Sequence, residues 1–183
     1  MRFQVVSFLA ALPFSLANLA DLSYSAPPER LAAAQKEAGC NLPAGFQISD
    51  FSAKTNGTGP TPALTAYSFA YSDPDTDVAV KCSYNSSSVS TTPGSLTPRY
   101  ACENSDVKFI LSGATGRTLT LIERICPGPN GVKGYEVAGA VDLALNCSTT
   151  PASCKTSSND VRGNFTSLDP VTDPTRIKRW VPR

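Results

Sequence analysis

The sequence contains no histidine, and only one methionine and one tryptophan, among its 183 residues. Without histidine, Ser-His-Asp and Cys-His catalysis are excluded, and so are zinc sites that need imidazole ligands. Charged residues make up only 17% of the chain, with 16 basic and 15 acidic residues giving a net charge of +1. This balance argues against a basic surface for nucleic acid or anionic lipid. We expect no cofactor and no metal.

Long apolar runs are also lacking. The longest covers about 14 residues, Phe3 to Leu16, follows Arg2 and is too short to span a membrane. It is typical of a secretory signal peptide, which we place at residues 1–17 with cleavage near Ala17, a second possible cut being after Ala20. The C-terminus is charged, so it lacks the apolar tail of a lipid-anchor signal. We therefore predict a secreted, extracellular protein with no membrane anchor.

The six cysteines are an even number, which in an exported chain favours three disulfides. Two of the pairs are predicted because each would close a short polar segment beside a strand, and the third follows by elimination. The predicted pairs are Cys82 with Cys102, Cys147 with Cys154, and Cys40 with Cys126.

Four N-glycosylation sequons begin at Asn56, Asn85, Asn146 and Asn164. We expect glycans at Asn56, Asn85 and Asn164, each of which must then face solvent. Asn146 should be modified little, because the middle residue of its sequon is Cys147.

The chain divides into four parts. The signal peptide is followed by residues 18–39, which form either a spacer or a short helix, because proline at Pro28 and glycine at Gly39 mark a start and a stop. Residues 40–154 form a disulfide-stabilised β domain. Residues 155–183 are rich in Ser, Thr, Asn, Asp and Pro without periodicity, which predicts a disordered tail.

Apolar residues in the β domain recur with a period of two, which predicts strands. Leu64 to Tyr84 is a predicted hairpin with a loop of about six residues around Asp73-Pro74-Asp75. Later strands are expected at 107–111, 119–125 and 135–145, with a turn at 113–116 between the first two. Closely spaced strands without helices between them predict an all-β antiparallel barrel or sandwich.

The order of these features resembles the Alternaria major-allergen family of small secreted fungal proteins, which includes elicitors and candidate effectors. The matching residues include Phe46-x-Ile48-x-x-Phe51, Ser68-Phe69, Cys82-Ser83, Tyr100-Ala101-Cys102, Phe109, Leu119, Leu121, Leu143-x-Leu145-x-Cys147 and Cys154. The resemblance implies a compact β-barrel without a known catalytic centre. It also implies a homodimer linked through Cys40, whereas Cys126 offers Cys40 a partner within the chain.

Three patterns suggest chemistry. Asp73, Asp75 and Asp77 alternate like calcium ligands, but Val78 and Tyr84 stand where the loop needs glycine and glutamate, which favours an ordinary turn.

A glycosidase needs two carboxylates facing one cleft. The candidates in the β region are Glu103, Asp106, Glu123, Glu136 and Asp142. Glu123 falls on the same face of its predicted strand as residues expected to point inward. A surface charge at a strand end is nevertheless the favoured interpretation.

The aromatic residues could form a stacking platform for a ligand, although core packing is the commoner role of aromatics on such strands. The candidate ligand-facing residues are Tyr67, Phe69, Tyr71 and Tyr84.

Near the C-terminus, Lys178-Arg179 is a candidate processing site.

Taken together, the patterns predict a non-enzymatic recognition protein of the effector or elicitor kind that binds a host extracellular protein. The alternatives are a carrier of a small apolar or phenolic ligand and an atypical cell-wall hydrolase.

Overall fold

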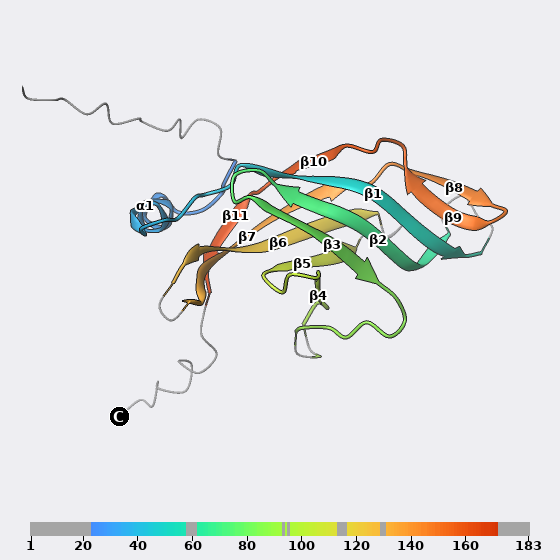
Figure 1. Cartoon of the computed structure of the whole chain (residues 1–183), viewed down its shortest axis with the longest axis horizontal. Helices are drawn as coiled ribbons and strands as arrows, with labels where there is room; N and C mark the ends of the chain where they lie inside the picture. Colours follow the sequence, from blue (N-terminus) through green and yellow to red (C-terminus); the bar gives the residue numbers. More distant parts are fainter. Residues whose placement is uncertain are drawn as a thin grey trace, which may run out of the picture.

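The fold consists of two antiparallel β-sheets and one helix (Figure 1). The computed structural model describes residues 23–57, 62–92, 94, 96–112, 117–128 and 131–171. The predicted signal peptide, the turn at 113–116 and Lys178-Arg179 lie outside these residues.

The six-stranded sheet has the order β3-β2-β1-β9-β8, and β10 pairs with β1. Its strands are β1 (Gly45–Asn56), β2 (Ala63–Asp73), β3 (Val78–Tyr84), β8 (Leu145–Thr149), β9 (Ala152–Thr156) and β10 (Val161–Asn164). The predicted hairpin is the pair β2 and β3, joined by the turn Pro74–Asp77. Along β1, β10 pairs with residues 45–48 and β9 with residues 52–54, so the two short strands share one edge.

A bulge in β1 allows this arrangement. The register with β2 shifts between Ser49 and Ser52, where Asp50 has a φ of 54°. An extra residue in one strand bends it and resets the alternation of its side chains. Ile48 before the bulge and Phe51 within it therefore both face the core.

The five-stranded sheet has the order β11-β7-β6-β5-β4. Its strands are β4 (Tyr100–Ala101), β5 (Val107–Ser112), β6 (Thr118–Pro127), β7 (Lys133–Asp142) and β11 (Ser167–Pro170). The strand predicted at 135–145 is in fact two strands in different sheets. β7 ends at Asp142, and the chain crosses to the other sheet before β8 begins at Leu145.

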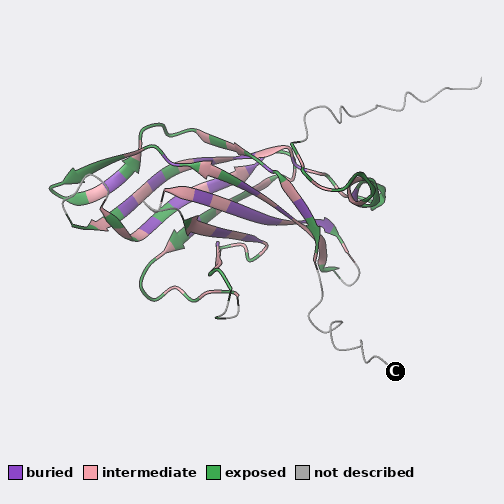
Figure 2. Cartoon of the chain, turned by 180° about the vertical axis from the view of Figure 1, so that it is seen from behind, coloured by how far each residue is buried: buried purple, intermediate pink, exposed green. Residues whose placement is uncertain are grey.

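The two sheets pack face to face as a sandwich. Figure 2 shows buried and more exposed residues alternating along the strands, as expected when each sheet has one inward face. Phe69 on β2 meets Phe109 on β5 with 5.3 Å between ring centroids. Among the described strands, none is hydrogen-bonded into both sheets, so the structure is not the closed barrel that the family resemblance implies.

One corner of the sandwich brings the two sheets into backbone contact. The chain passes from β10 to β11 through Phe165, which is fully buried and lies 5.1 Å from Phe46 between ring centroids. A side chain at Gly139 on β7 would put its Cβ 2.1 Å from the carbonyl oxygen of Asn164. Glycine at this position is what allows the two backbones to approach.

The helix α1 (Pro28–Lys36) lies at one end of the sandwich (Figure 1). Ala34 is fully buried, and Arg30 hydrogen-bonds the carbonyl of Leu168 at 3.1 Å and forms an ion pair with Asp169 on β11. Just before the helix, the amide of Ser25 donates to the carbonyl of Thr166 at 2.8 Å. These contacts attach the segment around α1 to the five-stranded sheet.

The prediction of a disordered tail from residue 155 is wrong for residues 155–171. This stretch completes β9 and forms β10 and β11, which pair with β1 and β7. β10 and β11 have four residues each, too few to show a convincing period of two, and their partners are distant in sequence. The rest of the predicted tail, residues 172–183, lies outside the described residues.

Candidate functional site

Three of the four candidate ligand-facing aromatics belong to the core. Tyr67, Phe69 and Tyr71 are 7%, 3% and 1% exposed, and their side chains point from β2 toward the other sheet. Their proposed role as a ligand platform is therefore wrong, because the second sheet covers their rings. Tyr84, at the end of β3, is half-buried and stacks on Tyr67 with 4.9 Å between ring centroids.

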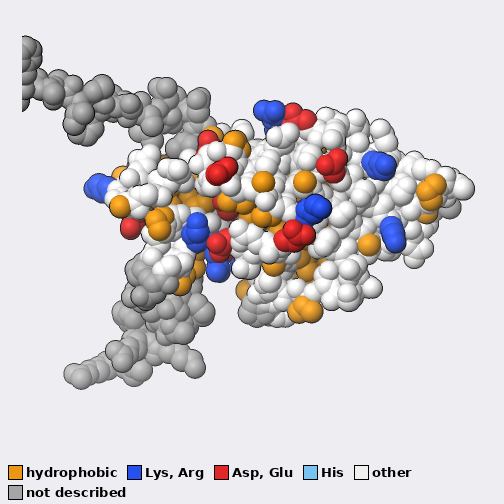
Figure 3. Space-filling model, viewed as in Figure 1, with side chains coloured by type: hydrophobic (Ala, Val, Ile, Leu, Met, Phe, Trp, Pro, Cys, Tyr) orange, Lys and Arg blue, Asp and Glu red, His pale blue; other side chains and the backbone are white. Residues whose placement is uncertain are grey.

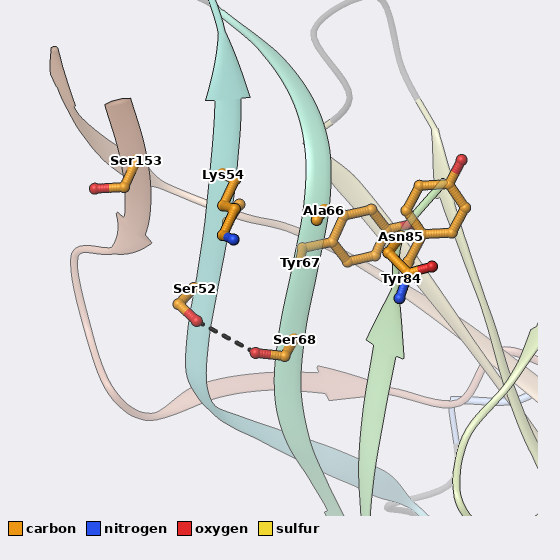
Figure 4. Close-up of a pocket in the computed structure, with 9 residues that line it drawn as sticks. Ser52, Lys54, Ala66, Tyr67, Ser68, Tyr84, Asn85 and Ser153 are labelled. Atoms are coloured by element: carbon orange, nitrogen blue, oxygen red, sulfur yellow. Dashed lines mark hydrogen bonds between the residues drawn. The ribbon is translucent and has the colours of Figure 1, made fainter. Parts of the chain in front are cut away.

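A groove of about 420 Å³ lies on the outer side of the six-stranded sheet (Figure 4). It is lined by Ser52, Ala53, Lys54, Ala66, Tyr67, Ser68, Tyr84, Asn85 and Ser153, from β1, β2, β9 and the end of β3. The cross-strand pairs place Ser52 next to Ser68, and Lys54 between the small residues Ala66 and Ser153. Ala53, Tyr67 and Tyr84 form one cross-strand row on the inward face, so on the outer face the hollow lies over the serine and alanine side chains between Lys54 and Asn85.

Two buried carboxyl groups meet inside the sandwich. Asp73 at the end of β2 is 1% exposed, and Glu123 on β6 is 2% exposed. Thr76, in the turn after β2, has its Oγ1 2.8 Å from Oδ2 of Asp73 and 2.8 Å from Oε1 of Glu123. The hydroxyl of Tyr71 donates to Oε2 of Glu123. We call Asp73 and Glu123 the acid pair.

The geometry of the acid pair favours a shared proton. The hydroxyl of Thr76 carries only one hydrogen, so it donates fully to one carboxyl, and the other must be protonated to donate back. Burial raises the pKa of Glu123 to about 7, and Asp73 contributes to that increase despite the opposing hydrogen bonds from Tyr71 and Thr76. Burial also raises the pKa of Asp73. A shared proton avoids placing two buried negative charges side by side.

The interpretation of Glu123 as a surface charge is thus wrong. The residue faces inward with Leu119, Leu121 and Ile125, as its phase in the strand indicates. In the sequence, Asp73, Tyr71 and Glu123 belong to three separate patterns, and nothing in it marks Thr76. These residues alternate along their strands in step with buried neighbours, which could have indicated that they face inward. Residues 47 or more positions apart, however, cannot be paired from one sequence.

Asp73, Asp75 and Asp77 belong to the turn after β2, as predicted from the sequence. Oδ1 of Asp73 accepts a hydrogen bond from the amide of Asp75 at 2.8 Å, and Oδ2 of Asp75 accepts one from the amide of Ala44 at 2.8 Å. These carboxylates are used to fix the turn against the segment before β1. Within the described residues, no group of three or more histidine, cysteine, aspartate or glutamate side chains is arranged to hold a metal ion.

The structure contains the same three disulfides that the sequence predicts: Cys40–Cys126, Cys82–Cys102 and Cys147–Cys154. The first ties the segment after α1 to the end of β6. The second joins β3 to the residue after β4, and the third joins the neighbouring strands β8 and β9. Three disulfides are typical of proteins from secreted or extracellular compartments.

All four sequon asparagines lie on the six-stranded sheet or immediately beside it, and all are exposed. Asn56 ends β1, Asn85 follows β3, Asn146 is in β8 and Asn164 ends β10. The positions agree with the requirement that a glycan face solvent.

The loop of residues 85–99 connects the two sheets and presents apolar side chains to solvent. Val89 and Leu96 are 83% and 60% exposed. The Cys82–Cys102 disulfide closes the base of the loop, and the amide of Thr91 donates to the carbonyl of Arg99 at 2.8 Å across it.

Arg99 anchors the end of this loop through an ion pair of 3.2 Å with Glu136 on β7. Glu136 also accepts a hydrogen bond of 3.0 Å from Arg124 and lies 3.8 Å from Lys108. Although burial alone would raise it, these three cations hold the pKa of Glu136 below its usual value. Glu136 therefore has a structural role, and its cationic partners make it a poor proton donor.

No family model, curated protein or solved structure matches the chain. In the described part of the chain, no helix combines the length and apolarity needed to cross a membrane.

Proposed function

We propose that this chain is a secreted, non-enzymatic recognition protein that binds an extracellular protein of a host. The three disulfides support export, and the resemblance to the Alternaria major-allergen family supports an effector or elicitor role. The 85–99 loop is the contact region in this proposal.

The exposed apolar side chains of that loop are the observation that carries the proposal. Val89 and Leu96 have the highest exposures of the large hydrophobic residues described. Both sit on a loop closed by a disulfide and by internal hydrogen bonds, such as that from Oγ1 of Thr92 to the carbonyl of Thr97 at 2.9 Å. Residues held by such hydrogen bonds lose little conformational entropy on binding, and exposed apolar groups gain from burial.

The interior favours recognition over the two rival functions. Hydrolysis by paired carboxylates needs access for substrate and water, but Asp73 and Glu123 are at most 2% exposed. Carriage of a ligand between the sheets needs space there, and in the described core that region is occupied by Tyr67, Phe69 and Phe109.

We propose that the protein acts without a disulfide bond to a second chain. In the family that the sequence resembles, one cysteine can link two chains, and the resemblance implies the corresponding place for Cys40. Cys40 is bonded to Cys126 of the same chain, so its sulfur is already used.

Capture of the mature protein's partners from host extracellular fluid tests the proposal. Wild-type protein is compared with the double variant Val89→Asp/Leu96→Asp, and with Val132→Asp as a matched control at another apolar residue, which is 56% exposed. We expect a host protein that is retained by wild type and by the control and reduced at least tenfold by the double variant. The captured protein should then bind purified wild type directly in calorimetry.

A host protein bound equally well by the double variant would place the contact elsewhere. Retention of a small molecule in place of a protein would favour the carrier. Both variants are checked by circular dichroism and thermal unfolding, so that loss of folding is not mistaken for loss of binding.

A further inference from the structure

The groove on the six-stranded sheet contains a sequon asparagine in its wall. Asn85 lines it together with Tyr84, Lys54 and the small residues between them (Figure 4). Oδ1 of Asn85 accepts hydrogen bonds from the amide of Ser87 at 2.9 Å and from its hydroxyl at 2.6 Å. The oxygen is thus engaged, and Nδ2, the atom that carries the sugar in N-glycosylation, is left as the free end of the side chain.

We propose that the groove is the binding site for the protein-proximal sugars of a glycan attached to Asn85. The inference rests on the export assumed in the proposed function. The attachment is made by the cell: Nδ2 bonds to the anomeric carbon of a lipid-pyrophosphate-linked oligosaccharide, the lipid pyrophosphate leaves, and the amide loses one proton. The chain itself supplies the asparagine and the surface on which the sugar lies.

The chemistry of the groove suits a neutral sugar. Its polar groups are the paired hydroxyls of Ser52 and Ser68, 3.3 Å apart, and the ammonium group of Lys54, whereas the hydroxyl of Ser153 donates to the carbonyl of Pro151. Ala66 supplies apolar surface, whereas the ring of Tyr84 stacks on Tyr67 at the inward side of the sheet. A sugar ring has hydroxyl groups around its edge and a less polar face, so both kinds of surface find partners. Figure 3 shows the surrounding face as mostly uncharged, with charged side chains scattered over it.

The volume and the tether together favour an attached glycan over a free sugar. A groove of about 420 Å³ is within the size range of small-ligand sites, roughly 300 to 1,000 Å³. It is open and has few polar groups, so it would hold a free sugar weakly. A covalent tether raises the local concentration of its ligand to roughly the millimolar range, so that weak contacts suffice for occupancy.

Two other sequons lie on the same sheet but outside the groove. Asn56 ends β1, and Asn146 pairs with Lys155 beside it on β9, so both belong to the sheet that holds the groove. They are not among the residues that line it. The variant Asn56→Gln therefore serves as a matched control, because it removes a sequon from the same sheet but leaves the groove intact.

The test is the rate of acetylation of Lys54, measured by peptide mass spectrometry on protein secreted from a eukaryotic host. Wild type, Asn85→Gln and Asn56→Gln are compared, and Lys155, which does not line the groove, is the internal reference. We expect Lys54 to react at least threefold more slowly in wild type and Asn56→Gln than in Asn85→Gln, with Lys155 unchanged. Trimming the glycan to its first sugar should preserve the protection.

Four results would overturn the inference: Asn85 unmodified in the secreted protein, equal reactivity of Lys54 in wild type and Asn85→Gln, a similar loss of protection in Asn56→Gln, or loss of protection on trimming. The last would mean that outer sugars shield the face without occupying the groove. Failure of the partner-capture experiment leaves these outcomes unaffected, because acetylation does not depend on a partner.

Discussion

The hydroxyl of Tyr71 donates a hydrogen bond to Glu123, and both side chains are buried between the two sheets. The carboxyl group belongs to the acid pair, and burial raises its pKa, so its ionisation costs stability. The stability of the protein should therefore vary with pH in a way that one pair of residues controls.

We expect the free energy of unfolding to fall as the pH rises from about 4.5 to about 7. Burial raises the pKa of Glu123 to about 7 in the folded state, whereas the unfolded chain has a value near 4.3. In this window the folded state binds more protons, so stability is greatest below the unfolded pKa and is lost as the pH passes through the folded pKa. The loss should be on the order of 3 kcal/mol.

Urea unfolding at intervals between pH 4.5 and 7.5 measures this dependence, with Glu123→Gln as the comparison. Glutamine has nearly the same shape but does not titrate, so the decline should be much smaller in the variant. An unchanged slope in Glu123→Gln would assign the dependence to other groups. Carboxyls with lowered pKa values, such as Glu136, act in the opposite direction and at lower pH.

Tyr71→Phe should lower the free energy of unfolding by about 1 to 3 kcal/mol, because it removes a donor from a buried carboxyl. The effect should be larger at pH 7.5 than at pH 4.5, since an ionised Glu123 depends more on its donors. Tyr67→Phe is the control, because Tyr67 is also buried but its hydroxyl is not a donor to the acid pair. Equal losses in the two variants would contradict this account.

Local patterns predicted those parts of the fold that are decided by near neighbours. The alternation of Tyr67, Phe69 and Tyr71 identified the inward face of β2, and the polar segment between Cys82 and Cys102 identified their disulfide. In contrast, β10 is held by pairing with β1, more than 100 positions earlier in the chain. Such long-range pairing leaves no local periodicity in a four-residue strand.

The same difference between local patterns and long-range contacts applies to the candidate sites. The exposure of Asn85 followed from its turn-forming neighbours, but the groove beside it needs Ser52 and Lys54 from β1, which only the sheet register brings near. Thr76 joins the acid pair because the turn after β2 folds over β6. Neither relation could be inferred from spacing.

Removing the disulfides one at a time should destabilise the protein in the order of the chain segments they close. The separations are 86 residues for Cys40–Cys126, 20 for Cys82–Cys102 and 7 for Cys147–Cys154. The chain-entropy model gives losses of about 4.6, 3.3 and 2.4 kcal/mol for paired cysteine-to-alanine variants. Thermal and urea unfolding of the three variants checks the order, and a larger loss for the shortest segment than for the longest would contradict the entropic explanation.

Gly139→Ala should destabilise the corner where β10 meets β7. A Cβ at this position would lie 2.1 Å from the carbonyl oxygen of Asn164 and 2.9 Å from the ring of Phe46, so backbone must move to accept it. We expect a loss of at least about 2 to 3 kcal/mol, the range typical of overpacked cores, and a melting temperature lower by roughly 5 to 10 °C. Gly94→Ala is the matched control, because nothing lies within 4 Å of its added Cβ, and its effect should stay within about 0.5 kcal/mol. A Gly139→Ala protein as stable as the control would show that the two sheets do not approach closely at this corner.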